Sequence, residues 1–325
     1  MKIGAWIHPG DGRDLTEQIE SAAENGLTTL RCYHYGYAQR VAADLKHAKM
    51  SLFGGMNVDA AGLVGDWRSQ LRLDDLARYH DLGVPLEAIS VGNELREGGD
   101  RPDLKRFTAR LSFGLANLLY AYRDWLDKHG YPTLLTYAME GIVFDSHGEF
   151  YEWVWPLVDA CDVVSVNLYP MEKNAWFGFG AFEESRRFLN DPRARHDRLN
   201  AFEYQLRRLL HQLERVGKPL ILSETGFPSA VGYHRVNESL VVPESDPAAY
   251  SEAMREFLGL IYRVNHEHWQ AIRGLYLYEW WDNLYHTKIL NEEQSPIHSA
   301  FGLCDSTGVP KFDIQRILSE VDGEH

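Results

Sequence analysis

Two hydrophobic periodicities alternate along the chain. Eight short apolar runs, rich in β-branched and aromatic residues, are separated by longer stretches in which apolar residues recur every three or four positions. The short runs are apolar throughout, so we expect strands that are buried on both faces, as in parallel sheets. The predicted strands are 2–8, 28–35, 51–57, 88–94, 132–139, 163–170, 219–226 and 274–281.

The longer stretches predict amphipathic helices. The first begins after Asp14, a residue type that caps helix N-termini, has Glu17 in its first turn and ends at Gly26. Eight strands alternating with eight helices favour a (β/α)8 TIM barrel, a closed α/β fold, over an open doubly wound sheet. The predicted helices are 14–25, 38–49, 64–82, 103–129, 148–159, 197–216, 246–268 and 310–321.

The connections between these elements differ in length. Turns from a helix back to a strand are short, whereas the segments 171–196, 227–245 and 282–309, which follow strands, are long. Long loops therefore gather at the C-terminal ends of the strands, where barrel enzymes build their active sites. The sequence contains no linker, low-complexity tract or short repeat, so we expect residues 1–325 to form a single catalytic domain.

Charge and cysteine content argue against several classes of partner. The chain has 33 basic and 47 acidic side chains and a net charge of −14, which repels phosphate backbones and anionic lipids, so we expect neither nucleic acid nor a membrane as partner. The cysteines Cys32, Cys161 and Cys304 are too few and scattered for a disulfide framework or a zinc knuckle, and we expect buried thiols at Cys32 and Cys161. Without a signal sequence or a long apolar run, a cytoplasmic protein is expected, with a secreted mature form as the alternative.

Carboxylates stand at the ends of three predicted strands, at Glu94, Glu224 and Glu279. Removing a lone charge from water costs roughly several kcal/mol, so carboxylates on strands buried on both faces are expected at the rim of the barrel. Further polar residues stand near the ends of the second, third and sixth predicted strands. They are Tyr33, Tyr35, Asn57, Asn167 and Tyr169.

The pair Glu94 and Glu224 fits the cleavage of a glycosidic bond. Two carboxyl groups about 5–5.5 Å apart can attack an anomeric carbon and protonate the leaving oxygen. At that spacing their repulsion is about 3 kcal/mol with an effective dielectric near 20, so one stays protonated while the other is charged. Strands four and seven lie almost across a barrel from each other, so a sugar ring fits between them. A structural salt bridge for Glu94 and a helix-cap contact for Glu224 are the alternatives.

The segments around these residues resemble those of known enzymes. The segment SVGNEL with Glu94 and the segment LSETGFPS with Glu224 resemble the acid/base and nucleophile motifs of clan A glycoside hydrolases. The narrower similarity is to glycoside hydrolase family 17, the β-1,3-glucanases and related transglycosylases. Arg31 with Tyr33, and Asn167 with Tyr169, resemble its strand-two and strand-six motifs. YEWWDN and FGLCDSTGVPKF resemble its strand-eight and closing segments, so the similarity runs from strand two to the C-terminus.

This resemblance implies a retaining hydrolase or transglycosylase for β-linked glucans or gluco-oligosaccharides, without cofactor or metal. Glu224 would be the nucleophile and Glu94 the general acid/base. Phe227, Asn283 and His286 replace the tryptophan, acidic residue and lysine often found there, which leaves the sugar and linkage open. The alternatives are a β-mannosidase or β-galactosidase of the same clan, a carbohydrate-binding barrel without activity, and a metal-dependent isomerase. The oligomeric state stays open.

Several other residues are predicted to contact the substrate. Asn93 is expected to bind a sugar 2-hydroxyl, with a turn-forming role as the alternative, and Tyr169 to orient the nucleophile or pack in the core. Glu279 either binds hydroxyls or pairs with Arg31. The rest of the predicted substrate-binding set comprises Arg31, Tyr33, Asn57, Asn167, Phe227, Trp280, Trp281 and Asp282.

Three further features bear on the predicted site. Flat indole rings stack on sugar faces, so Trp176 joins Trp280 and Trp281 as a stacking candidate, and we expect at least one of the three in the core. The charged run 183–198 is either a substrate lid or a solvated loop. The histidines expected to line the cleft are His8, His34 and His286.

Overall fold

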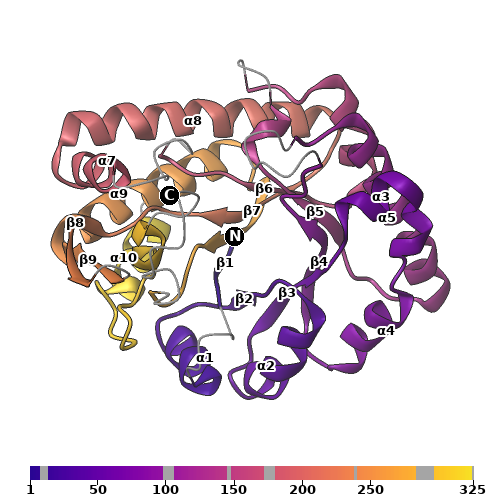
Figure 1. Cartoon of the computed structure of the whole chain (residues 1–325), viewed down its shortest axis with the longest axis horizontal. Helices are drawn as coiled ribbons and strands as arrows, with labels where there is room; N and C mark the ends of the chain where they lie inside the picture. The colour runs from indigo at the N-terminus through magenta and orange to yellow at the C-terminus, as the bar shows by residue number, and fades with distance from the viewer. Residues whose placement is uncertain are drawn as a thin grey trace.

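Eight parallel strands close into a barrel in the computed structural model, which describes residues 1–7, 14–97, 106–144, 148–171, 180–237, 240–282 and 296–323 (Figure 1). The order around the barrel is β1-β10-β7-β6-β5-β4-β3-β2, and β1 pairs with both β10 and β2, which closes the ring. The predicted barrel is confirmed and the open sheet is excluded. The barrel strands are β1 (Lys2–Trp6), β2 (Thr29–Arg31), β3 (Ser51–Met56), β4 (Leu86–Asn93), β5 (Leu135–Met139), β6 (Val164–Asn167), β7 (Leu220–Thr225) and β10 (Ile272–Leu277).

Helices surround the barrel on the outside, as Figure 1 shows. Asp14 caps the first helix as predicted, since its side chain accepts from the backbone N–H groups of Thr16 and Glu17. Two later helices, α8 and α9, begin with an aspartate cap followed by proline at the first helical position. The helices are α1 (Leu15–Glu24), α2 (Tyr35–His47), α3 (Ala60–Asp66), α4 (Leu73–Asp81), α5 (Ala109–His129), α6 (Trp155–Ala160), α7 (Gly180–Asn190), α8 (Pro192–Arg215), α9 (Pro247–Glu267) and α10 (Ile314–Gly323).

Three predicted segments differ from the structure. The single helix expected at 64–82 is divided into α3, a 3-10 turn η1 (Trp67–Gln70) and α4, because the Asp66 side chain caps the turn and interrupts α3. The charged run 183–198 is largely helical, within α7 and the start of α8, so the solvated-loop interpretation is wrong, whereas the lid interpretation stays a prediction. The segment 227–245 contains the hairpin strands β8 (Ala230–Asn237) and β9 (Leu240–Ser245).

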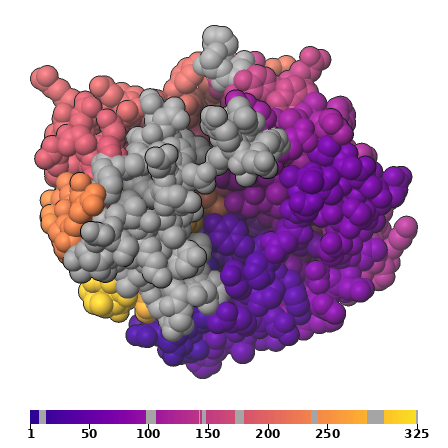
Figure 2. All heavy atoms as spheres, viewed as in Figure 1, coloured from indigo at the N-terminus to yellow at the C-terminus, as the bar shows by residue number. Residues whose placement is uncertain are grey.

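The two halves of the chain occupy opposite sides of one face of the molecule. Figure 2 shows the salmon atoms of α7 and α8 and the orange atoms of the hairpin at one side, with the violet atoms of the first half at the other. Among the residues placed in the structure, no helix is long and apolar enough to cross a lipid bilayer.

The core has one part inside the barrel and one part between strands and helices. Phe53 of β3 and Tyr276 of β10 have ring centroids 5.0 Å apart although their strands are not neighbours, so the contact crosses the barrel interior. Ala88, Val163 and Ile221 belong to the same interior cluster. The larger part packs the outer faces of the strands against the helices. All three cysteines are buried and unpaired, which confirms the prediction for Cys32 and Cys161.

Candidate active site

A bulge at the end of β4 shapes one side of the site. The pairing of β4 with β5 shifts register between Ser90 and Asn93, and Gly92 has φ of 88° there. The Ser90 hydroxyl donates to the Gly92 carbonyl at 2.7 Å and accepts from the Ala138 N–H at 3.1 Å. Glu94 follows with φ of 47°, a conformation that costs a non-glycine residue about 1–3 kcal/mol. Bulges at barrel rims redirect side chains beside active sites.

Residues of β6 and the segment that follows it hold both predicted catalytic carboxylates. The register places Asn167 opposite Glu224 of β7. Asn167 Nδ2 donates to Glu94 Oε1 at 3.0 Å, and the Tyr169 hydroxyl donates to Glu224 Oε2 at 3.0 Å. Glu94 and Glu224 are therefore brought to one place from strands that are not neighbours in the barrel. Glu224 is nearly buried, with 6% of its surface exposed, whereas Glu94 is half-buried.

A buried guanidinium lies beside Glu224 and Asn93. Arg31 Nη1 lies 3.7 Å from Glu224 Oε1, and Nη2 donates to Asn93 Oδ1 at 2.9 Å. The guanidinium carbon also sits over the rings of Trp6 and Phe53, 4.1 and 4.8 Å from their centroids. Burial lowers the pKa of Arg31, and the neighbouring Glu224 charge acts in the opposite direction. Arg31 thus compensates the carboxylate charge where water is largely excluded.

The side chain of Asn93 is oriented by this network. Its Oδ1 accepts from Arg31 Nη2 and from Asn167 Nδ2, the latter at 3.3 Å. Two donors at the oxygen fix the orientation of the carboxamide, so that its NH2 group remains as the donor. No described residue accepts a hydrogen bond from this group. The group is therefore placed to donate to a ligand, and the sugar-binding role of Asn93 stays a prediction.

Three tyrosines lie around the carboxylates, at Tyr33, Tyr169 and Tyr278. Burial raises the pKa of each hydroxyl well above its usual value. The charges of Glu224 and Glu94 raise all three pKa values further, which shows that the tyrosines share one electrostatic environment with both carboxylates. The three hydroxyls therefore remain protonated and serve as donors at neutral pH.

The segment after β10 contributes two acidic residues, Glu279 and Asp282. Glu279 is buried, with 1% of its surface exposed, and the Tyr278–Glu279 peptide bond is cis. Among the described residues, the ion pair of Arg31 is with Glu224 rather than with Glu279. Asp282, predicted to bind substrate, instead accepts from Lys311 Nζ at 2.6 Å in a nearly buried pair. Burial raises the pKa of Asp282 to about 6, while Lys311 acts to lower it.

Two of the predicted aromatic contacts are core residues. Phe227 is fully buried, because Gly226 (φ of 136°) turns the chain and the ring packs inward. It contacts the rings of Phe188, Tyr250 and Phe257. Trp280 is also fully buried. Neither ring is exposed for stacking on a sugar.

The remaining predicted residues occupy other positions. Trp281 keeps 7% of its surface exposed, and its indole packs closely over Gly308. Asn57 and His34 line a pocket at the C-terminal ends of β2 and β3. The residues Trp176, His8, Asn283 and His286 lie outside the described part of the chain.

Sequence reasoning missed two residues of this site. Trp6, at the end of β1, packs against Tyr33 with ring centroids 3.9 Å apart and the planes tilted by 41°, and it donates from Nε1 to the Ser223 carbonyl at 3.0 Å. Tyr278 follows β10 directly. Both stand at the C-terminal ends of barrel strands, so the positional rule that selected Glu94 also applies to them. Among described residues, no group of three or more His, Cys, Asp or Glu is arranged for a metal ion.

Comparison with known proteins identifies similar folds among solved structures but no related sequence. No family profile matches the sequence. No curated protein matches it either. Solved structures do match. An endo-laminarinase from Formosa Hel1_33_131 has a TM-score of 0.65 and 16% identity, over 98% of this chain and 87% of the other. A β-1,3-glucanase and pollen allergen of Cryptomeria japonica has a TM-score of 0.61 and 13% identity, over 96% and 98%.

A third similar structure is longer. The β-glucuronidase of Ruminococcus gnavus, in complex with uronic deoxynojirimycin, has a TM-score of 0.62 and 12% identity over 98% of this chain. The present chain spans about half of its length, 49%. The barrel described here is thus the fold of several proteins named as glycoside-cleaving enzymes, which agrees at the level of fold with the resemblance found in the sequence.

Proposed function

We propose that this protein is a retaining glycoside hydrolase or transglycosylase for β-linked glucans or gluco-oligosaccharides. The observation on which this rests is the pair of carboxylates from β4 and β7, each hydrogen-bonded by a residue of the intervening β6 region. The named activities of the structural neighbours, a laminarinase and a β-1,3-glucanase, support a glucan as substrate.

Glu224 is the nucleophile in this proposal. Its Oε2 accepts from Tyr169 and its Oε1 faces Arg31, so the carboxylate is held in a fixed orientation with its charge compensated. Attack on the anomeric carbon forms a glycosyl ester, and the C–O bond to the leaving group breaks. The Tyr169 hydroxyl and the Arg31 guanidinium need not move during the attack, which lowers the reorganisation cost.

Glu94 is the general acid and then the general base. As the C–O bond breaks, its carboxyl group donates a proton to the leaving oxygen. The resulting carboxylate then removes a proton from water, or from an acceptor sugar hydroxyl, which attacks the ester and releases the glycosyl group with its original configuration. Asn167 Nδ2 at 3.0 Å orients Glu94 in both steps. The NH2 group of Asn93 donates to a sugar hydroxyl beside the nucleophile.

Turnover of the Glu224→Gln and Glu94→Gln variants on a panel of β-glucans, β-mannans and β-galactosides tests the proposal. We expect both variants to lose at least about a thousandfold in turnover, because each removes a group that the reaction requires. Glu97→Gln is the matched control, a carboxylate three residues beyond Glu94. Near wild-type rates in either variant contradict the assignment. The same panel decides between a glucanase and a mannosidase or galactosidase.

A further inference from the structure

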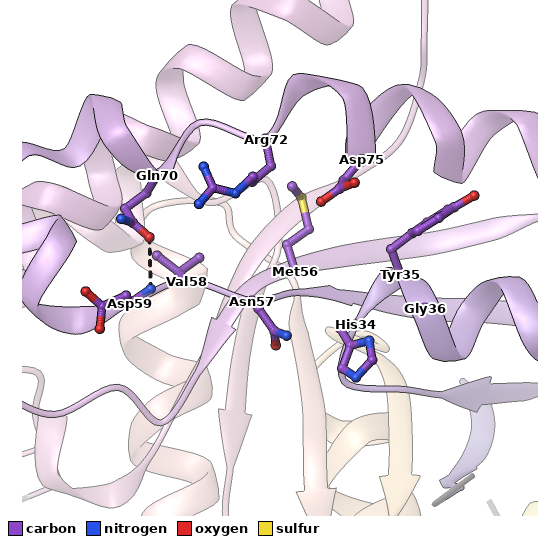
Figure 3. A pocket seen from close by; sticks show the side chains of 10 residues that line it. All are labelled: His34, Tyr35, Gly36, Met56, Asn57, Val58, Asp59, Gln70, Arg72 and Asp75. Carbon is purple, nitrogen blue, oxygen red and sulfur yellow. Dashed lines mark hydrogen bonds between the residues drawn. The ribbon is translucent and has the colours of Figure 1, made fainter. Parts of the chain in front are cut away.

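A pocket of about 500 Å³ lies at the C-terminal ends of β2 and β3 (Figure 3). This volume is typical of small-ligand sites, which span about 300–1,000 Å³. Neither Glu94 nor Glu224 lines it, so it is distinct from the point of bond cleavage. The lining residues are His34, Tyr35, Gly36, Met56, Asn57, Val58, Asp59, Gln70, Arg72 and Asp75.

Two lining residues relate the pocket to the neighbourhood of the proposed catalytic carboxylates. His34 directly follows Tyr33, whose hydroxyl shares the electrostatic environment of both catalytic carboxylates. Asn57 directly follows Met56 of β3, and Met56 pairs with Val91 near the end of β4. The pocket and the two carboxylates therefore lie at the same rim of the barrel, with the pocket on the β2–β3 side.

One wall of the pocket is held in place by a hydrogen-bonded turn. Gln70 Oε1 accepts from the Asp59 N–H at 3.0 Å, and Asp59 Oδ2 accepts from the Gly62 N–H at 2.6 Å. A Cβ at position 62 would collide with the Gln70 amide, so glycine permits this close approach. In Figure 3 the Gln70 and Arg72 side chains lie opposite Asn57 and His34. Because Gln70 itself is buried, the wall is formed before any ligand arrives.

Several hydrogen-bonding groups of the pocket are available to a ligand. Arg72 Nη1 donates to the carbonyls of Ser69 and Leu71, and no described residue accepts from its Nε or Nη2. The exposed Asn57 carboxamide makes no hydrogen bond with any residue in the described ranges. Burial lowers the pKa of His34, so its neutral ring offers one donor and one acceptor near pH 7.

The charges of the lining favour a neutral ligand. Arg72 is accompanied by Asp59 and Asp75, so the lining has no excess of positive charge to hold an anionic substituent. Asp75 also forms an exposed ion pair with Arg78 at 3.3 Å. The Met56 and Val58 side chains add apolar surface among these polar groups. Paired donors and acceptors beside an apolar patch match the hydroxyl groups and C–H face of a sugar ring.

We propose that this pocket is an accessory subsite that binds a neutral sugar unit of an oligosaccharide, remote from the bond that is cleaved. It would make longer gluco-oligosaccharides better substrates than short ones and would not accept a uronic acid at this position. This inference rests on the proposed glycosidase function for the cleft, whereas the binding of a sugar in the pocket is a separate property.

The test compares kcat/KM on an aryl β-glucoside with kcat/KM on β-1,3- and β-1,4-linked gluco-oligosaccharides of increasing length. Arg72→Met removes the donors and Val58→Phe fills the pocket, while Arg40→Ala on the exposed side of α2 is the control for charge loss. We expect the gain in kcat/KM with chain length to fall about tenfold in both pocket variants, which is the loss expected for about one hydrogen bond to a charged group. The aryl glucoside and the control should show wild-type rates.

The proposed subsite is overturned if kcat/KM depends on oligosaccharide length in both pocket variants as it does in the wild type. It is also overturned if both variants lose kcat/KM equally on the aryl glucoside. Failure of the proposed function is recognised separately, because the wild type would then cleave none of these substrates. In that case, calorimetric titration with the longest oligosaccharide tests whether the pocket binds a sugar. Binding weakened about tenfold by Arg72→Met and Val58→Phe supports it, and absent or unchanged binding overturns it.

Discussion

At the scale of single residues, Arg31 connects the elements of the site. Its guanidinium contacts Glu224 of β7 and Asn93 of β4, while its own strand is β2. A buried charge is costly unless it is paired, and here the partner is the proposed nucleophile. Arg31 therefore fixes the relative position of β4 and β7 side chains as well as their charge balance.

Tyr169→Phe tests the hydrogen bond to Glu224 at 3.0 Å. A hydrogen bond to a charged group contributes about 1.5–3 kcal/mol, so we expect kcat/KM to fall roughly 10- to 100-fold without loss of the fold. Tyr204→Phe, in which the exposed hydroxyl of α8 is removed, is the control and should retain wild-type kcat/KM. Wild-type kinetics for Tyr169→Phe argue against a role in orienting the nucleophile.

Asp282 predicts a pH dependence of stability. Its pKa is raised from 3.8 to about 6 by burial, so between pH 4 and 6 the folded state binds more protons at this residue than the unfolded state. The free energy of unfolding contributed by Asp282 therefore falls as pH rises through this window and is flat above it. Urea unfolding of the wild type and Asp282→Asn measures the difference. We expect the free energy of unfolding of the wild type, minus that of Asp282→Asn, to fall from pH 4 to 6. A rise of this quantity over the same range contradicts the raised pKa.

The sequence could predict which residues come together where a contact follows from position at a strand end. Asn167, Tyr169 and Arg31 are examples, since the ends of parallel strands meet at one rim. Phe227 shows the limit of this reasoning. The direction of its ring depends on Gly226, whose φ of 136° cannot be inferred from the apolar pattern.

At the scale of secondary-structure elements, the bulge of β4 controls the position of Asn93 and Glu94. Gly92→Ala places a Cβ 3.0 Å from the Leu95 side chain on a backbone with φ of 88°. We expect the free energy of unfolding to fall by about 1–3 kcal/mol and kcat to fall with it, since the proposed acid/base Glu94 is displaced.

Gly65→Ala is the matched control for this substitution. A Cβ there has no neighbour within 4 Å, and alanine favours the helix α3 by up to about 1 kcal/mol. We therefore expect unchanged kcat and equal or higher stability in chemical unfolding. Equal effects of the two substitutions on kcat contradict a role for the bulge.

The strands could be predicted because buried parallel strands have a continuous apolar pattern, whereas the elements of the long loops could not. The hairpin of β8 and β9 contains polar residues and is held by its own antiparallel pairing. Helix α7 was missed because its charged residues obscure a buried face, which includes Phe182, Phe188 and Leu189 and depends on tertiary contacts. The Asp66 cap similarly divides a stretch whose periodicity suggests one helix.

At the scale of the whole molecule, closure of the barrel between β1 and β10 joins the two ends of the chain into one sheet. A closed sheet has no edge at which part of the molecule can separate, so we expect the predicted single domain to unfold in one transition. Far-ultraviolet circular dichroism and tryptophan fluorescence should give the same midpoint in urea. Two separate transitions contradict a single cooperative unit.

The central claim is that Glu224 forms a covalent bond to the sugar. A 2-deoxy-2-fluoro-β-glucoside with a dinitrophenyl leaving group slows the second step more than the formation of the ester, so that the intermediate accumulates. Mass spectrometry of the digested protein then locates the label. We predict one fluoroglucosyl group on the peptide that contains Glu224, and none in Glu224→Gln. A label on another residue, or hydrolysis with inversion at the anomeric carbon, would contradict the account.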